Sequence, residues 1–320
     1  MEKSVEITVI APMFNEAPDI TRNVGRFLEA LKKRDDQWEM ILVNDGSTDE
    51  TLELVNKLAE NEPRLRVISY AGNRGRGYAL RQGFRAARGE FVITTESDLN
   101  WGTEIIDALY KKLKNTDAEV VIASPYLKGG RLENIPFKRA FLSRFGNKLL
   151  TFSVPGNLTM LSGMTRGYRR EVLDSLELEA DGKEIHLEIV AKCLALGYRI
   201  VEIPAVLRWD REHEKKSKRV SKFHARKLIL SHLAFSFYQK PMMIFGLAGL
   251  IMVLGGLVLA LVFAVQFIMR TLYPARPIYL LMVILLVAGI QMLSFGFVAN
   301  QIGSIKKEIY RLQRQTRRRD

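Results

Sequence analysis

The first part of the chain alternates between short apolar runs rich in valine and isoleucine and longer segments with helical spacing of apolar positions. The runs expected to be strands are Val5–Ala11, Glu39–Asn44, Arg66–Ser69, Phe91–Thr95 and Val120–Ala123. The segments expected to be helices are Thr21–Lys33, Asp49–Glu60, Tyr78–Arg88 and Thr103–Lys114. Strands and helices alternating at this spacing predict an α/β domain whose mostly parallel sheet is covered on both faces.

A polar cluster follows each of the first four predicted strands. The clusters are Pro12–Glu16, Asp45–Asp49, Gly72–Gly77 and Glu96–Asn100. Ligands of open α/β sheets bind at the carboxyl ends of the strands, so we expect these four loops to form one site. Taken alone, Asp45–Asp49 also fits a turn that leads into a helix N-cap.

The glycine and acidic clusters differ in what they predict. Gly72–Gly77 follows the third strand and lacks the GxGxxG spacing, so a dinucleotide site is not expected. Glu96 and Asp98 point to the same face if their stretch is extended. Two adjacent carboxylates and the amide of Asn100 are hard oxygen ligands that suit Mg2+ or Mn2+. The sequence predicts a metal site on these three residues, with a solvated acidic turn as the alternative.

Two segments near the C-terminus, Met242–Ile268 and Ile278–Ile302, contain no charged residue. Each exceeds the roughly 20 residues that a helix needs to cross a membrane. We expect two transmembrane helices in a tight hairpin; two buried helices of a soluble bundle are the alternative. Gly289, Gly296 and Gly303 recur every seven residues and form one smooth helix face. The sequence leaves open whether that face packs on the hairpin partner or on another subunit of a homo-oligomer.

The formal net charge is +13, and the basic residues gather beside the two spans. Nine Lys or Arg lie between Arg211 and Lys240 and seven between Lys306 and Arg319, against two in the connection between the spans. This asymmetry predicts that both termini and the first domain are cytoplasmic. The partner of the basic flanks is then anionic membrane lipid rather than nucleic acid. The acidic start predicts no signal peptide, and the single Cys193 excludes an intramolecular disulfide.

The segments Pro12–Glu16, Val43–Asp49 and Glu96–Asn100 together resemble the motifs of the family-two glycosyltransferases with the GT-A fold. The resemblance covers roughly residues 5 to 240 and is to the polyprenyl-phosphate branch, with its dolichyl-phosphate mannose synthases and undecaprenyl-phosphate glucosyltransferases. We expect a GT-A domain over 1–210, a basic juxtamembrane region over 211–240, the spans within 241–303 and a basic tail over 304–320. The donor nucleotide contacts that the resemblance implies are Pro12, Phe14, Glu16, Val43, Asp45, Asn73 and Arg76.

The run Glu96–Asn100 stands where the family has Asp-Ala-Asp-Leu-Gln, the motif that binds the metal and the diphosphate. Two of its side chains differ from the family's by one methylene, which leaves the choice between Mg2+ and Mn2+ open. The resemblance implies that Glu96, Asp98 and Asn100 are the metal ligands.

The acceptor side is implied by matches later in the chain. Arg139 and Ser143 match the family's Arg-x-x-x-Ser on the helix that receives the lipid phosphate, and a spacing of four places them on one helical face. Arg211 and Lys218 match a later Arg and a Ser-Lys pair, although Arg208 competes with Arg211 for the arginine role. The expected acceptor phosphate ligands are Arg139, Ser143, Arg211 and Lys218.

Three further segments bear on the same side. Pro125 replaces the arginine of the family's Ser-Arg-Tyr motif, so Lys128 or Arg131 would have to replace that contact. Glu202–Pro204 resembles the family's Glu-x-Pro. Ser221–Tyr238 is expected to be a juxtamembrane helix with basic and apolar faces.

The resemblance implies transfer of one hexose from UDP-glucose or GDP-mannose to undecaprenyl or dolichyl phosphate, with inversion and with Asp98, Arg139 and Arg211 as catalytic residues. A lipid phosphate has a second pKa of about 6, so its oxygen needs no general base. Glu188, in a helix expected over Glu184–Leu196, is either a sugar-hydroxyl contact or a helix-stabilising acid. The alternatives are a non-catalytic membrane adaptor that keeps nucleotide-sugar binding and a processive polysaccharide synthase. We expect the protein in the plasma membrane of a prokaryote.

Overall fold

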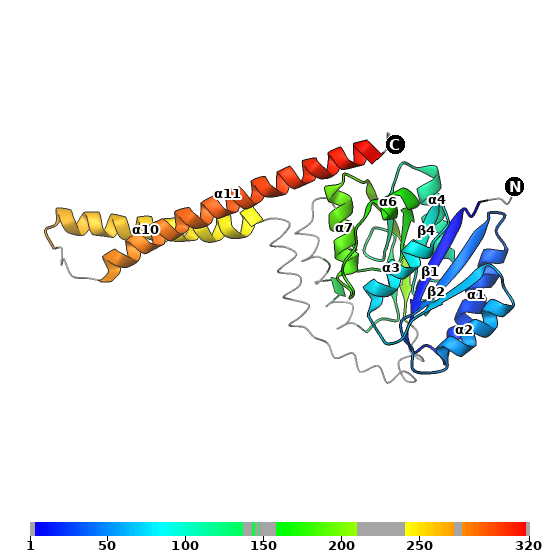
Figure 1. Cartoon of the computed structure of the whole chain (residues 1–320). Coiled ribbons are helices and arrows are strands. Elements are labelled where there is room, and N and C mark those ends of the chain that lie inside the picture. Colours follow the sequence, from blue (N-terminus) through cyan, green and yellow to red (C-terminus); the bar gives the residue numbers. More distant parts are fainter. Residues whose placement is uncertain are drawn as a thin grey trace. The chain divides into compact units, whose positions relative to one another are not determined.

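The computed structural model describes residues 4–136, 143–144, 147, 158–209, 241–271 and 277–317. The chain forms two compact units, Met1–Phe223 and His224–Asp320, which we treat separately (Figure 1). Of the predicted site residues, Arg139, Arg211 and Lys218 lie outside the described residues, as does the predicted helix Ser221–Tyr238.

The first unit is built on a seven-stranded sheet with the order β3-β2-β1-β4-β7-β5-β8. Its strands are β1 (Ile7–Met13), β2 (Trp38–Asn44), β3 (Leu65–Ser69), β4 (Phe91–Thr94), β5 (Val120–Ser124), β7 (Arg166–Arg169) and β8 (Ile200–Pro204). All pairings are parallel except those of β7, which runs antiparallel between β4 and β5. Every residue of β2 is buried, as expected for a strand covered on both faces of a mostly parallel sheet.

Helices connect and cover these strands. They are α1 (Ile20–Lys32), α2 (Thr51–Glu60), α3 (Arg76–Ala86), α4 (Glu104–Asn115), α6 (Arg170–Ser175) and α7 (Ile185–Ala195). In α1 the buried positions, among them Val24, Phe27, Leu28 and Leu31, recur every three or four residues, so one face of the helix enters the core. Figure 1 shows α1 beside α2. A small sheet pairs β6 (Arg131–Glu133) with β9 (Val206–Arg208) in parallel.

The expected α/β fold is confirmed, with differences in the end of β1 and in the strands that follow β5. β1 continues through Pro12 and Met13, which pair with β2, so the loop after it begins later than predicted. β6, β8 and β9 were not predicted, and neither was β7. It contains Arg166, which is completely buried and donates to the carbonyl oxygens of Leu161, Gly163 and His186 at 2.5–2.9 Å. Those carbonyls replace the water that this guanidinium loses on burial.

Among the described residues of the second unit are two apolar helices, α10 (Pro241–Ile268) and α11 (Pro277–Arg317). Both are long and apolar enough to cross a membrane, over Phe245–Ile268 and Pro277–Ile305. Among the described residues, all the large hydrophobic side chains that are exposed lie between Met242 and Leu312. This exposure argues against the buried-bundle alternative and for a lipid-facing hairpin.

Glycines set the contact between the two helices. A Cβ on Gly249 would lie 2.7 Å from the Gly289 carbonyl oxygen, and one on Gly289 would lie 2.9 Å from the Gly249 carbonyl oxygen. A Cβ on Gly296 would lie 3.1 Å from that of Phe245, whereas Gly303 has nothing within 4 Å. The glycine face around Gly289 and Gly296 therefore packs on the hairpin partner.

The second helix is longer than predicted, because α11 does not end near Ile302 but continues to Arg317. At 1.5 Å per residue its 41 residues span roughly 60 Å, about twice the hydrocarbon thickness. The first part of the predicted basic tail is therefore helical.

Candidate active site

The loops that follow β1 and β2 are joined by hydrogen bonds at the carboxyl edge of the sheet. The backbone N–H of Asn15 donates to Ser47 Oγ at 3.0 Å, and Asn15 Oδ1 accepts the backbone N–H of Thr48 at 2.9 Å. The Glu16 N–H donates to the Thr51 hydroxyl at 2.8 Å. Two segments more than 30 residues apart thus form one rigid rim, as predicted from the polar clusters.

Asp45 anchors the loop that follows β3. Its side chain is 5% exposed, and its carboxylate accepts hydrogen bonds from the Tyr70 hydroxyl, the Asn73 amide and the backbone N–H groups of Arg74 and Gly75, at 2.8–3.2 Å. These donors from its own chain occupy the carboxylate. The geometry shows that Asp45 shapes the loop after β3, while its contact with the donor nucleotide stays a prediction.

The other residues predicted to contact the donor nucleotide lie along the same edge of the sheet. Pro12 and Val43 are paired in β1 and β2. Val43 is the exception, because its side chain is fully buried in the core. Phe14 and Glu16 follow β1 and are partly exposed.

Gly75, at the N-cap of α3, and Gly77, in its first turn, allow a close approach to the loop at Ala180 and Asp181. A Cβ on Gly77 would lie 2.3 Å from the Ala180 carbonyl oxygen, and Gly75 has φ +99°. The N–H groups of Gly77 and Tyr78 donate to the Asp181 carbonyl oxygen at 2.7 and 3.2 Å. The first turn of α3 is therefore capped by the backbone carbonyl of Asp181.

Glu188 holds the loop that caps α3. Its carboxylate accepts the N–H groups of Glu179 and Ala180 at 2.9–3.2 Å and the Lys192 ammonium at 2.7 Å. Burial alone would raise the pKa of Glu188, but the hydrogen bonds from Lys192, Ala180 and Glu179 outweigh it and lower that pKa. Of the two roles considered for Glu188, the contacts support the structural one. The expected helix is confirmed as α7 (Ile185–Ala195).

The acidic residues after β4 lie in a turn. The prediction that Glu96 and Asp98 point to the same face assumed an extended stretch. The stretch is not extended, because it turns at Ser97 and Asp98, and Leu99 has φ +57°. Glu96 accepts the Trp101 indole N–H at 3.2 Å and lies 3.5 Å from the Arg76 guanidinium.

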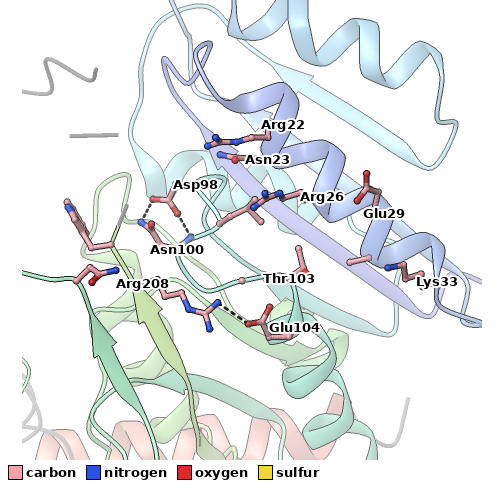
Figure 2. A pocket seen from close by; sticks show the side chains of 15 residues that line it. Arg22, Asn23, Arg26, Glu29, Lys33, Asp98, Asn100, Thr103, Glu104 and Arg208 are labelled. Atoms are coloured by element: carbon pink, nitrogen blue, oxygen red, sulfur yellow. Dashed lines mark hydrogen bonds and ion pairs between the residues drawn. The ribbon is translucent and has the colours of Figure 1, made fainter. Parts of the chain in front are cut away.

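The Asp98 carboxylate faces its neighbour Asn100. It accepts the backbone N–H of Asn100 at 3.2 Å and the side-chain amide at 2.7 Å (Figure 2). Burial, together with the negative charges of Glu96 and Glu16, raises the pKa of Asp98 from 3.8 to about 7, against the opposing effects of the Asn100 N–H and Arg76. Negative charge is therefore costly at this turn unless a cation joins it.

A divalent cation fits this donor set. In the described part of the chain, no group of three or more His, Cys, Asp or Glu side chains could hold a metal ion unaided. Mg2+ is commonly held by only one or two carboxylates together with substrate phosphates and water. Glu96 and Asp98 supply two carboxylates whose mutual repulsion a cation would relieve, and Asn100 already orients one of them.

A cleft of about 820 Å³ opens beside Asp98 and was not predicted (Figure 2). It is lined by residues of α1, of the segment from Asp98 to Glu104, and by Asn134, Arg208 and Trp209. The residues from α1 and its C-cap are Arg22, Asn23, Arg26, Glu29, Ala30 and Lys33. They lie on or beside the polar face of an amphipathic helix, so only the fold reveals that they share a cleft.

Arg208 also lines this cleft. Its backbone N–H donates to the Asn100 carbonyl oxygen at 2.8 Å, and its guanidinium lies 3.1 Å from Glu133 and 3.7 Å from Glu104. Of the two arginines considered for the phosphate role, Arg208 is therefore placed near Asp98. The favoured one, Arg211, lies outside the described residues and its role stays a prediction.

Of the predicted acceptor phosphate ligands, Ser143 is the one that lies among the described residues. Its hydroxyl lies 2.7 Å from the Tyr126 hydroxyl, which follows the end of β5. This places Ser143 at the carboxyl end of the same sheet. Pro125 lies between Ser124 and Tyr126 and offers no charged group to an anion.

The chain is similar in sequence to known glycosyltransferases. The sequence model described as "Glycosyl transferase family 2" matches residues 8–177. A dolichol-phosphate mannosyltransferase of Pyrococcus furiosus is 29% identical over 203 residues, which cover 62% of this chain but only 56% of that relative. A dodecaprenyl-phosphate galacturonate synthase of Rhizobium johnstonii is 28% identical over 94% of this chain and 88% of its own length. An undecaprenyl-phosphate 4-deoxy-4-formamido-L-arabinose transferase of Photorhabdus laumondii is 26% identical over 96% and 92%.

Solved structures are similar in fold. Glucosyl-3-phosphoglycerate synthase of Mycobacterium tuberculosis, crystallised with Mn2+, UDP-glucose and phosphoglyceric acid, superposes with a TM-score of 0.53 and 21% identity. The match covers 72% of this chain and 80% of that one.

Proposed function

Because the chain belongs to glycosyl transferase family 2 and pairs a GT-A fold with two apolar helices, we propose that it transfers one sugar from a nucleotide-sugar donor to a polyprenyl phosphate. The observation that carries the proposal is the acidic turn at Glu96 and Asp98, at the carboxyl edge of the sheet, where burial and repulsion make a cation favourable. The relatives that share both the first domain and the C-terminal helices are named as polyprenyl-phosphate sugar transferases, which supports this acceptor class.

The names of the relatives contain different sugars, so they do not select one donor for this chain. The proposed donor is therefore a nucleotide that carries a simple hexose. We propose UDP-glucose first and GDP-mannose second. The acceptor is undecaprenyl or dolichyl phosphate.

The chemistry needs only positioning and charge. An oxygen of the lipid phosphate bonds to the anomeric carbon while that carbon's bond to the diphosphate breaks, and the electron pair leaves with the nucleoside diphosphate. One in-line displacement inverts the anomeric centre and requires no proton transfer. Mg2+ or Mn2+ held by Glu96 and Asp98 would neutralise the charge of the leaving diphosphate. Arg76 balances Glu96 from the start of α3. The proposed acceptor phosphate ligands are Arg139, Ser143, Arg211 and Lys218, since arginine forks match phosphate oxygens.

The basic flanks of the spans support a location at the membrane. Both termini and the first domain would lie on the cytoplasmic side of a prokaryotic plasma membrane, with anionic lipids next to residues 211–240 and the basic C-terminal end.

Membranes that contain the full chain test the reaction with a panel of labelled UDP- and GDP-sugars and added undecaprenyl phosphate. We expect label in the organic phase with one donor, and its loss in Glu96→Ala and Asp98→Ala. Asp174→Ala, which changes an exposed acid of α6, is the matched control and should keep activity. Nucleotide-sugar binding without any lipid product would favour the adaptor, an alternative that Pro125 keeps open by removing a cation from the acceptor side.

A further inference from the structure

We propose that Glu202 and Asn147 are positioning residues for the acceptor phosphate, because together they fix Ser143 at the carboxyl end of β5. The inference rests on the proposed function, in which Ser143 receives that phosphate. Neither side chain needs to touch a substrate for this role.

Glu202, on β8, fixes one half of a short backbone segment. Its two carboxylate oxygens accept the N–H of Thr159 at 2.8 and 2.9 Å and the N–H of Met160 at 2.7 Å. The Thr159 hydroxyl donates to the same carboxylate at 2.9 Å. Hydrogen bonds from successive N–H groups to a carboxylate are stronger than bonds between neutral groups.

Asn147 fixes the other half of that segment. The side chain is 3% exposed, and its Oδ1 accepts the N–H groups of Leu161 and Ser162 at 3.1 and 3.3 Å. Its side-chain amide donates to the Ser143 carbonyl oxygen at 3.0 Å. Four consecutive N–H groups are thus held by two side chains, one of which also holds the backbone of Ser143.

A second path joins the same groups from the opposite side. The Ser124 hydroxyl, at the end of β5, lies 2.6 Å from that of Thr159 and accepts the Tyr126 N–H at 3.2 Å. The Tyr126 hydroxyl closes the path at 2.7 Å from the Ser143 hydroxyl. The hydrogen bonds form a closed ring, so Ser143 is fixed both through its carbonyl and through its hydroxyl.

This ring gives the Glu-x-Pro motif a physical role. Pro204 pairs with Ser124 at the end of β8, and the adjacent Ala205 N–H donates to the Ser124 carbonyl oxygen at 3.0 Å. The motif therefore ties the acceptor side to the sheet. Gln at position 202 has almost the shape of Glu, but it removes the negative charge, and its NH2 group at the Oε2 position would face the N–H and the hydroxyl of Thr159, so the hydroxyl would lose its acceptor.

Glu188 is the matched control, because its carboxylate also accepts two successive N–H groups, those of Glu179 and Ala180, but on the donor side. The test uses the full-length protein in detergent and measures the dissociation constants of geranyl phosphate, a short polyprenyl phosphate, and of UDP and GDP with Mn2+. The variants are Glu202→Gln, the milder Ser124→Ala, Ser143→Ala and Glu188→Gln.

We expect Glu202→Gln and Ser143→Ala to weaken geranyl phosphate binding about tenfold, the scale of one lost charged hydrogen bond, with nucleotide affinity unchanged. Ser124→Ala should weaken it in the same direction, and it serves as the test if Glu202→Gln does not fold. Glu188→Gln should leave geranyl phosphate binding at the wild-type value. Weaker binding in Ser143→Ala but not in Glu202→Gln or Ser124→Ala would overturn the positioning inference alone. Unchanged binding in Ser143→Ala would remove the acceptor site itself, and the inference with it.

Discussion

Replacing Asp98 by Asn should make the metal-free protein more stable at alkaline pH. Raising the pKa of Asp98 from 3.8 to about 7 corresponds to about 4 kcal/mol, at about 1.4 kcal/mol per pKa unit. The Asp98 side chain is only partly buried, and solvent screening reduces the effect of its charge, so we take roughly half of this free energy, about 2 kcal/mol. Asn would also lose part of the hydrogen bonding with Asn100, at about 1 kcal/mol. A net gain of about 1 kcal/mol remains at pH 8.

The stability gained by Asp98→Asn should depend on pH. The folded-state pKa of Asp98 lies above the unfolded value, so between about pH 4 and pH 7 the folded protein keeps a proton that the unfolded chain has released. The stability from this group is fully present below pH 4 and is lost as the pH rises through 7. The advantage of Asp98→Asn should therefore shrink to near zero at pH 5.

The assay is urea unfolding of the full chain in detergent with EDTA, followed by tryptophan fluorescence. Trp38, Trp101 and Trp209 all lie in the first unit, so the signal reports on that unit. Asp174→Asn, an exposed acid, is the control and should change stability by less than about 0.5 kcal/mol. An Asp98→Asn protein that is no more stable than wild type at pH 8, or that differs equally at both pH values, would refute the electrostatic reasoning.

The glycine contacts give two more predictions. Gly77→Ala should destabilise the first unit by about 1–3 kcal/mol, because its Cβ would meet the Ala180 carbonyl. Gly25 lies in α1, and a Cβ there would have nothing within 4 Å, so Gly25→Ala should stabilise the first unit by about 0.5–1 kcal/mol. Urea unfolding that finds Gly77→Ala more stable than Gly25→Ala would contradict this packing. In the second unit, Gly289→Leu should separate the helices and abolish disulfide cross-linking between cysteines introduced across the hairpin, whereas Gly303→Leu should not. Equal cross-linking in both variants would show that the glycine face packs elsewhere.

Much of the fold follows from local sequence, because β1 to β5 are apolar runs bounded by turn residues and the spans are uncharged. β7 could not be predicted in this way, because it buries Arg166, and only distant carbonyl groups make that burial tolerable. The extended geometry assumed for Glu96 and Asp98 failed because the chain turns at Ser97 and Asp98, shortly after β4 ends at Thr94.

The site was predictable at the level of loops but not of contacts. Polar clusters after the strands indicated which loops would lie together, since parallel strands bring their carboxyl ends to one edge. The roles of Asp45 and Glu188 depend on loops brought together by the fold, as does the ring around Ser143, where Glu202 meets Thr159 from 43 residues away. No local pattern contains that information.

The central claim is that the acidic turn gathers a nucleoside diphosphate through a cation. Electron paramagnetic resonance of Mn2+ titrated into the full-length protein, with and without UDP or GDP, tests it directly. The account predicts that one of these nucleotides tightens Mn2+ binding in the wild type and that Asp98→Ala abolishes the nucleotide-dependent signal. Mn2+ bound equally well by Asp98→Ala in the presence of that nucleotide would contradict it.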